Sequence, residues 1–122
     1  MSNIHAARER AYYRQDGHCY YCRHPTWLAS PDAFARTHAM SLRCAQLYRA
    51  TAEHLRPRQD GGRGGDNIVV ACWLCNHRRH ARTGLSPTPE AYQHRIAQRV
   101  SAGGWWPSGC TVLASKRSLH KN

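Results

Sequence analysis

The sequence has little of the material that builds a large apolar core. Only one of its 122 residues is phenylalanine, and its mean hydropathy is −0.73 although 41% of the residues are hydrophobic. A chain of this length has the size of one domain, and a second core would be hard to build from it. We therefore expect a single domain over residues 1–122, with its core in 6–84 and a C-terminal helix and basic tail in 85–122. So small an apolar core also predicts an additional cross-link that stabilises the fold.

Long apolar segments are absent as well. No apolar run approaches the roughly 18 residues of a membrane-spanning helix. The N-terminal segment carries Arg8, Glu9 and Arg10, where a signal peptide would be apolar. We therefore expect a cytoplasmic protein that does not bind membranes. Because the cytosol keeps thiols reduced, the cysteines are expected to bind metal rather than to form disulfides.

Acidic residues are scarce. The chain has seven Asp and Glu against 18 Lys and Arg, which gives a formal charge of +11 and a pI near 10.1. This balance predicts a polyanionic partner, and binding should weaken steeply with salt because each neutralised phosphate releases counterions. The alternative is a charge that serves solubility or forms a basic tail. Basic residues recur from Arg8 to Lys121, so the charge is not confined to a tail.

Four of the six cysteines form two C-x-x-C pairs. Two residues between paired cysteines allow a tight turn to direct both sulfurs at one ion, and a tetrahedral zinc needs four such ligands. Because the pairs are far apart in the sequence, a shared structural zinc would tie two distant segments together. A redox dithiol would instead appear once beside a βαβ pattern, and no such pattern is visible. The four cysteines are Cys19, Cys22, Cys72 and Cys75.

Local patterns predict two strands followed directly by a helix. Asp16-Gly17 is suited to end a first helix, since glycine readily adopts a left-handed cap. Two runs that favour strand structure and the four-glycine loop at 58–66 between them indicate a hairpin. Ser30 and Thr88 each precede a proline, as an N-cap precedes the first helical residue. The expected helices are 6–15, 31–40, 76–82 and one that begins after 88, and the expected strands are 47–55 and 67–71.

The middle of the chain resembles the HNH endonuclease family. The resemblance rests on Ala52-Glu53-His54-Leu55-Arg56-Pro57, Gly61-Gly62, Asp66-Asn67-Ile68-Val69 and Ala71-Cys72-Trp73-Leu74-Cys75-Asn76. It covers residues 19–80, and several ordered elements with fitting separations are more specific than one short motif. In that family a ββα unit binds one divalent cation, and bacterial or phage members often carry two zinc knuckles. The resemblance therefore implies an α+β fold, a small zinc-stapled ββα-metal domain with flanking helices, in a bacterial or phage-encoded protein.

The resemblance also implies a role for each residue of the candidate site. His54 matches the general base, since a neutral imidazole titrates near physiological pH, and Asn67 matches the residue that supports the hairpin and orients the base. Glu53 and Asn76 match metal-ligand positions. His80 follows Asn76 by four residues, so on a helix both side chains would project from one face and could share an ion. Such mixed ligands suit Mg²⁺ or Mn²⁺, with Ni²⁺ as an alternative, better than a structural zinc.

The adjacent positions of Glu53 and His54 pose a difficulty. Successive residues of a regular strand point to opposite faces of the sheet. The two side chains can therefore reach one phosphate only if the strand ends or twists at this point. Pro57 and the glycine loop that follows it favour such an ending.

Arginines surround the proposed site in the sequence. A guanidinium group pairs bidentately with phosphate, so we expect these residues to position a nucleic-acid backbone rather than to read bases. They are Arg58, Arg63, Arg78, Arg79 and Arg82.

Two features have no assigned role. The stretch 23–50 is longer than the corresponding part of the minimal family core, and it either selects the substrate or merely covers the hairpin. Cys44 and Cys110 belong to neither cysteine pair and are expected to be small buried hydrophobic residues rather than metal ligands.

The leading prediction is a phosphodiester hydrolase, an HNH endonuclease that acts on DNA, with double-stranded DNA as the expected substrate. By the family resemblance its products would carry 5′-phosphate and 3′-hydroxyl ends. An RNase of the same fold and a catalytically inactive zinc module that binds nucleic acid are the alternatives. The intact set of a base beside metal ligands argues against the inactive module. A homodimer, or a larger phage or restriction assembly, would help to cut both strands.

Overall fold

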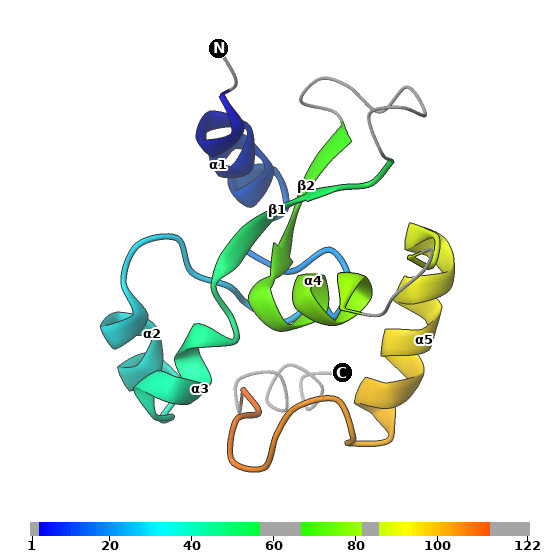
Figure 1. Ribbon diagram of the computed structural model, residues 1–122. Coiled ribbons are helices and arrows are strands. Elements are labelled where there is room, and N and C mark those ends of the chain that lie inside the picture. The colour runs from blue at the N-terminus through cyan, green and yellow to red at the C-terminus, as the bar shows by residue number, and fades with distance from the viewer. Residues whose placement is uncertain (1–2, 57–66, 82–85, 113–122) are drawn as a thin grey trace.

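The computed structural model in Figure 1 describes residues 3–56, 67–81 and 86–112. It is a small α+β structure in which helices surround a two-stranded antiparallel sheet. No helix in these ranges is long and apolar enough to cross a membrane. The elements are α1 (Ile4–Arg14), α2 (Pro31–Thr37), α3 (Leu42–Gln46), β1 (Ala50–His54), β2 (Ile68–Cys72), α4 (Trp73–His80) and α5 (Pro89–Ser101).

The predicted N-caps of two helices are confirmed. The hydroxyl of Ser30 accepts a hydrogen bond from the Ala33 amide at 3.1 Å and begins α2. The hydroxyl of Thr88 accepts one from the Ala91 amide at 3.2 Å and begins α5. Each bond satisfies one of the amides that the first turn of a helix leaves without a partner. In both helices a proline occupies the first turn, where its missing N–H costs nothing.

The ends of the first two helices show where sequence patterns were sufficient and where they were not. Asp16 and Gly17 both have positive φ, 56° and 75°, so α1 ends where the sequence predicts. The second helix ends at Thr37 rather than near residue 40, because the chain turns through a left-handed Ala39 with φ 54°. The short helix α3 then occupies residues that carry no helix signal, and for this reason β1 begins at residue 50 rather than 47.

The hairpin presents two different faces. Its register pairs Ala50 with Cys72 and His54 with Ile68. On one face Ala50 and Val70 pack against Ala11 of α1. On the other face Thr51 accepts a hydrogen bond from α4. Because side chains alternate along a strand, this arrangement places odd-numbered residues of β1 toward α4 and even-numbered residues toward α1. The hairpin loop at 57–66 lies outside the described residues.

The outer edge of β2 is closed by side chains and a turn rather than by a third strand. The side-chain amide of Gln15 accepts from the Val70 N–H at 2.8 Å and donates to the Val70 carbonyl at 3.0 Å, as a neighbouring strand would. The Tyr20 amide donates to the same carbonyl at 2.9 Å, and Arg14 donates to the Ile68 carbonyl at 3.0 Å. An unpaired strand edge would otherwise leave backbone groups without partners or invite another chain.

Aromatic residues fill the core between α3 and the segment that follows α5. Tyr48 is fully buried and stacks on Trp106, with ring centroids 4.2 Å apart. The Trp27 indole donates to the Ala45 carbonyl at 2.7 Å. Trp105 is also buried, so both neighbouring tryptophans belong to the core. Tyr92 and Ile96, four residues apart on one face of α5, are buried as well.

Cys44 and Cys110 correct the expectation that all cysteines are reduced. Both are buried, as predicted, but they form a disulfide across 66 residues of sequence, with Cα atoms 5.0 Å apart. The bridge joins α3 to the segment after α5, and the Tyr48 hydroxyl donates to the Cys110 carbonyl beside it. The pairing depends on packing between segments distant in the sequence, so spacing alone could not reveal it.

Replacing Gln15 with alanine should destabilise the protein, because the Val70 amide would lose its partner at a buried position. We expect a loss of about 1–3 kcal/mol in the free energy of unfolding. Urea denaturation followed by circular dichroism measures it. Gln98→Ala is the matched control, since Gln98 is exposed on α5. Equal losses in the two variants would contradict the role assigned to Gln15.

Candidate metal centres

Four buried cysteines converge on one point between the two halves of the chain. Their sulfur atoms all lie within 4.8 Å of one another, and the sulfurs of Cys22 and Cys72 are 4.0 Å apart. Tetrahedral ligands at the zinc–sulfur distance of about 2.3 Å are about 3.8 Å apart, so the group matches the size of such a site. It could hold a metal such as zinc. The group consists of Cys19, Cys22, Cys72 and Cys75.

Backbone amides surround the sulfurs as they surround thiolate ligands. The sulfur of Cys19 accepts from the amides of Tyr21 at 3.3 Å, Cys22 at 3.4 Å and Cys72 at 3.3 Å. The Cys72 sulfur accepts from the Cys75 amide at 3.4 Å and so caps α4. Burial would raise the pKa of Cys19, but hydrogen bonds from the other three cysteine side chains, and then from the Cys22 amide, outweigh burial and hold that pKa below its usual value. Burial raises the pKa of Cys22, Cys72 and Cys75 instead. Negative charge is therefore favoured at the Cys19 sulfur alone, and a bound metal cation would have to offset burial at the other three.

A second polar group surrounds Glu53, which is only 3% exposed on the face of β1 toward α4. One carboxylate oxygen, Oε2, accepts from the Tyr21 hydroxyl at 2.8 Å and from the guanidinium of Arg79. The other, Oε1, lies 3.1 Å from Nε2 of His80. Burial and the adjacent carboxylate raise the pKa of Tyr21, so its hydroxyl stays a donor. The carboxylate therefore has one oxygen bound by fixed donors and one that faces His80.

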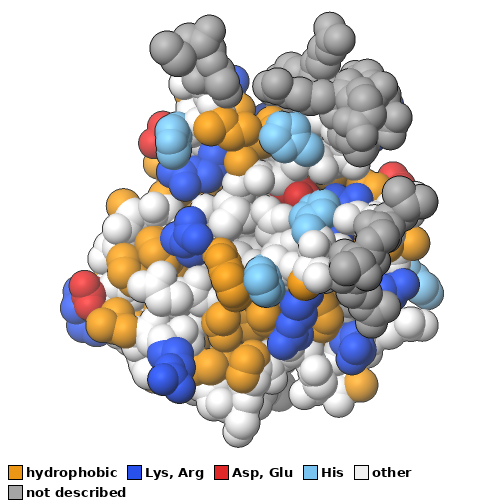
Figure 2. All heavy atoms as spheres, in the orientation of Figure 1, with side chains coloured by type: hydrophobic (Ala, Val, Ile, Leu, Met, Phe, Trp, Pro, Cys, Tyr) orange, Lys and Arg blue, Asp and Glu red, His pale blue; other side chains and the backbone are white. Residues whose placement is uncertain are grey.

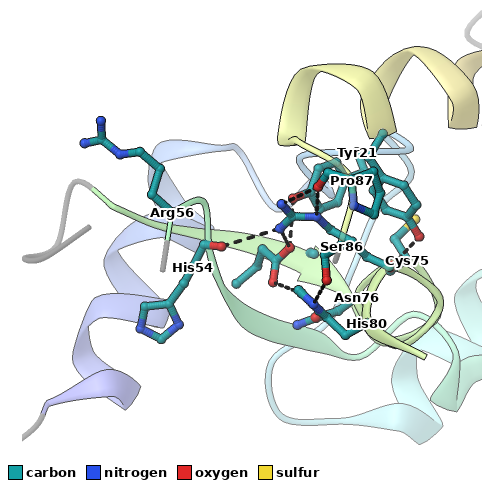
Figure 3. Close-up of polar contacts among 12 residues, drawn as sticks. Tyr21, His54, Arg56, Cys75, Asn76, His80, Ser86 and Pro87 are labelled. Atoms are coloured by element: carbon teal, nitrogen blue, oxygen red, sulfur yellow. Dashed lines mark hydrogen bonds and ion pairs between the residues drawn. The ribbon is translucent and has the colours of Figure 1, made fainter. Parts of the chain in front are cut away.

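His80 and Asn76 share a face of α4, as their spacing predicts. The Nδ1 atom of His80 lies 2.9 Å from the Ser86 hydroxyl. A proton on Nδ1 would leave the lone pair of Nε2 for a cation, whereas a proton on Nε2 would be donated to Oε1 of Glu53. Figure 3 shows His80 beside Ser86. The Asn76 amide donates to the Thr51 hydroxyl at 3.0 Å and to the Ala52 carbonyl at 3.4 Å. Its side-chain oxygen accepts no hydrogen bond from the described part of the chain.

His54 lies on the opposite face of the strand from Glu53. It is the last residue of β1 and is exposed. Its imidazole points away from His80 and Asn76, over the side that α1 occupies (Figure 3). Only its carbonyl faces the Glu53 group, 3.5 Å from the Arg79 guanidinium. The regular pairing of β1 with β2 continues through both residues, so the alternation of side chains separates them.

Asn67, the residue before β2, binds the backbone of Arg56, which lies two residues after His54. Its side-chain oxygen accepts from the Arg56 amide and its side-chain nitrogen donates to the Arg56 carbonyl, both at 2.9 Å. Its backbone carbonyl accepts from the Leu55 amide at 3.0 Å. This side chain thus bonds backbone and extends the ladder past the end of β1, as a support for the hairpin would.

The arginines predicted to contact a nucleic acid differ in burial and in their partners. Arg79 is buried, and its guanidinium is bound to Glu53 and to the Pro87 carbonyl, at 3.1 Å through Nε and 2.8 Å through Nη2. It therefore holds the candidate site together and is not placed to contact a nucleic acid. Arg78 is exposed and lies over the Trp105 ring. The other predicted arginines, Arg58, Arg63 and Arg82, lie outside the described residues.

Several contributors to the site carried no clear sequence signal. Tyr21 lies between the cysteines of the first C-x-x-C pair, and the turn that brings those cysteines together also places its hydroxyl on Glu53. Ser86 and Thr51 bind His80 and Asn76 through hydroxyls that no motif marks. Arg79 was predicted to contact a nucleic-acid backbone, and its ion pair with Glu53 was not expected, although a buried carboxylate requires a compensating charge.

Glu53 and His80, which form a hydrogen bond to each other, could instead contribute two ligands to a small divalent cation. The 3.1 Å between Oε1 of Glu53 and Nε2 of His80 is close to the separation of about 3.0 Å between adjacent octahedral ligands at 2.0–2.1 Å. The free oxygen of Asn76 lies one turn earlier on the same helix face. Among the described residues only the cysteine group brings together three or more His, Cys, Asp or Glu ligands. A cation at Glu53 would therefore keep open positions for water or phosphate.

If the cysteine group holds structural zinc, the purified protein should contain one zinc per chain and unfold when a strong chelator removes it. Metal analysis by mass spectrometry and circular dichroism measure both. Cys75→Ser should lose the metal and the fold. The double variant Cys44→Ser/Cys110→Ser should keep the zinc, because those cysteines form a separate disulfide. A folded wild-type protein free of zinc would contradict the assignment.

Replacing Arg79 with leucine should leave the Glu53 carboxylate buried without its cation. We expect a loss of about 3–5 kcal/mol in the free energy of unfolding. Arg78→Leu, one residue away on the same helix, removes an exposed arginine and should cost about 1 kcal/mol or less. A double variant that also carries Glu53→Leu should lose less than the sum of the two single changes. Additive losses would show that the two residues are not coupled.

Comparisons of the chain with protein-family models, with curated proteins and with solved structures find no match. The function has to be argued from the residues of the two centres and from their contacts.

Proposed function

We propose that this protein is a metal-dependent endonuclease similar to the HNH family, which hydrolyses phosphodiester bonds in DNA. The observation that carries the proposal is the Glu53–His80 pair. A buried carboxylate oxygen and an imidazole nitrogen lie 3.1 Å apart on a hairpin and the helix that follows it. The order of β1, β2 and α4 supports a ββα-metal unit, and the cysteine group at its base would supply the structural zinc.

Glu53, Asn76 and His80 would hold a Mg²⁺ or Mn²⁺ ion. Such an ion, when bound, neutralises charge on the scissile phosphate and the leaving oxygen. Arg79 and Tyr21 keep Oε2 of Glu53 in place, so that Oε1 stays directed at His80. Ser86 keeps the proton of His80 on Nδ1 when Nε2 binds the ion. The arrangement is therefore organised before a substrate arrives.

His54 would act as the general base, and its position constrains how the substrate lies. A neutral imidazole takes a proton from water, and the resulting hydroxide attacks the phosphorus while the leaving oxygen departs. Because His54 and Glu53 face opposite sides of β1, the phosphate would have to lie over the end of the strand, beside the exposed His54 and a cation held by the buried Glu53. Asn67, which extends the hairpin at this end, would hold the backbone of His54 in position.

The charge distribution supports an anionic polymer as substrate. The described residues include five acidic side chains, and the carboxylate of Glu53 is already paired with Arg79. On the face shown in Figure 2, basic side chains and histidines gather around α4, whereas acidic side chains are few and scattered. A surface of this kind favours phosphate backbones.

Supercoiled plasmid incubated with the zinc-loaded protein and Mg²⁺ or Mn²⁺ should be nicked or linearised. His54→Ala should lower the cleavage rate by about 10²–10⁴-fold, the usual contribution of a general base, without weakening DNA binding measured by fluorescence anisotropy. His80→Ala should lower cleavage and raise the metal concentration that half-saturates it. His94→Ala is the matched control, because His94 is exposed on α5.

Each outcome separates one role from another. Wild type and His54→Ala could cleave equally well while His80→Ala loses cleavage. That result would show that His54 is not the base but would support the metal site. Cleavage of RNA but not of DNA would assign the fold to an RNase. No cleavage of either polymer by a zinc-loaded wild type that binds them would leave a nucleic-acid-binding module without catalysis.

A further inference from the structure

A pocket of about 480 Å³ lies between α4, α5 and the segment after α5. Arginine dominates its lining, with four arginines among eight lining residues and no acidic side chain. Tyr92 and Trp105 supply aromatic walls. The volume lies in the range of sites that hold small molecules or parts of larger ligands. The lining arginines are Arg78, Arg79, Arg95 and Arg99.

Three of these arginines carry charge that no described acid offsets. Arg79 is paired with Glu53 and so contributes little net charge. Arg95 and Arg99 are exposed on adjacent turns of α5, and neither makes an ion pair or side-chain hydrogen bond within the described ranges. Like charges four residues apart on a helix destabilise it slightly. A concave surface of one sign also focuses the field and raises the local concentration of anions.

Arg78 is held in place before any ligand binds. Its guanidinium lies 4.6 Å from the centroid of the Trp105 ring and donates to the Trp105 carbonyl at 2.6 Å. A guanidinium has five N–H donors, so these contacts leave others available to a ligand. An arginine fixed in this way loses little side-chain freedom when it binds, which favours recognition.

We propose that Arg78, Arg95 and Arg99 form a phosphate-binding pocket that holds the backbone of a nucleic acid at a point separate from the candidate metal centre. Guanidinium groups bind phosphate oxygens bidentately, and the volume leaves room for the sugar beside the phosphate. The choice of a nucleic acid, rather than another phosphorylated ligand, rests on the proposed function.

The pocket adjoins the Glu53 site through Arg79, which lines the pocket and binds Glu53, whereas Arg78 lies on the other flank of α4. At about 100° per residue, Arg78 points about 160–200° away from Asn76 and His80. A nucleic acid bound at both places therefore crosses the helix, whose diameter with side chains is about 10–12 Å. The pocket would fix the path of the nucleic-acid strand. This path in turn would decide which phosphate lies at the candidate site of Glu53 and His54.

The test measures binding of a short fluorescent DNA duplex by anisotropy at several salt concentrations, with no divalent cation added, so that cleavage plays no part. Arg95→Gln/Arg99→Gln should bind about tenfold more weakly at moderate salt. The slope of log K against log salt should fall by about 1–2, one for each lost phosphate contact. The control Arg36→Gln/Arg43→Gln removes the same charge from exposed positions on α2 and α3 and should change the affinity less than threefold.

A second arm follows the Nε–Hε NMR signals of arginine during titration with the duplex and, separately, with inorganic phosphate. Movement of the pocket signals with the duplex supports the proposal. Movement with phosphate alone, with unchanged duplex affinity in Arg95→Gln/Arg99→Gln, would overturn it in favour of a small phosphorylated ligand. Equal losses in the two double variants would also overturn it. Neither result would contradict the proposed nuclease activity, because the cleavage assay with His54→Ala tests that activity separately.

Discussion

The convergence of four cysteine sulfurs is the constraint on which the rest of the structure depends. One pair follows α1, and the other ends β2 and begins α4, so the cluster joins the N-terminal helix to the hairpin and to the helix that follows it. Cys72 serves twice, as a member of the cluster and as the N-cap of α4. Tyr21 lies inside the first pair and reaches Glu53 from there. A metal in this cluster would therefore fix the fold and would also help to position the carboxylate of the candidate active site, since both depend on the same turn.

The buried carboxylate of Glu53 explains much of the architecture around α4. A carboxylate at 3% exposure is costly unless it is paired and hydrogen-bonded. Arg79 and Tyr21 meet that cost, and Arg79 in turn is bound to the carbonyl of Pro87, which holds the chain before α5 against α4. The contacts therefore link β1, α4 and α5 through one charged group. They also leave one carboxylate oxygen facing His80, which is the geometry on which the proposed function rests.

Alternation along β1 imposes the main limit on the proposed mechanism. It directs Glu53 toward α4 and His54 toward α1. The regular pairing of His54 with Ile68 fixes the two side chains on these opposite faces. A nuclease built on this hairpin has to act at the end of the strand, where a phosphate can contact both faces. The basic pocket between α4 and α5 would then set the path of the nucleic acid toward that end. Two separate contacts of this kind position a substrate better than one.

Much of this protein could be read from its sequence, because the signals are local. Spacing revealed the cysteine pairs, N-cap chemistry revealed the starts of α2 and α5, and the i, i+4 separation of Asn76 and His80 placed both on one face of α4. Four features were decided by the tertiary structure: the partner of Glu53, the helix α3, the disulfide between Cys44 and Cys110, and the side of the strand on which His54 lies. Each depends on which segments pack together or on where a strand begins and ends. Arg78 and Arg79 are neighbours of the same residue type, yet one is buried against a carboxylate and the other is exposed over a tryptophan, because α4 turns by about 100° between them. Composition and spacing determined which groups the protein possesses, and packing decided which of them meet.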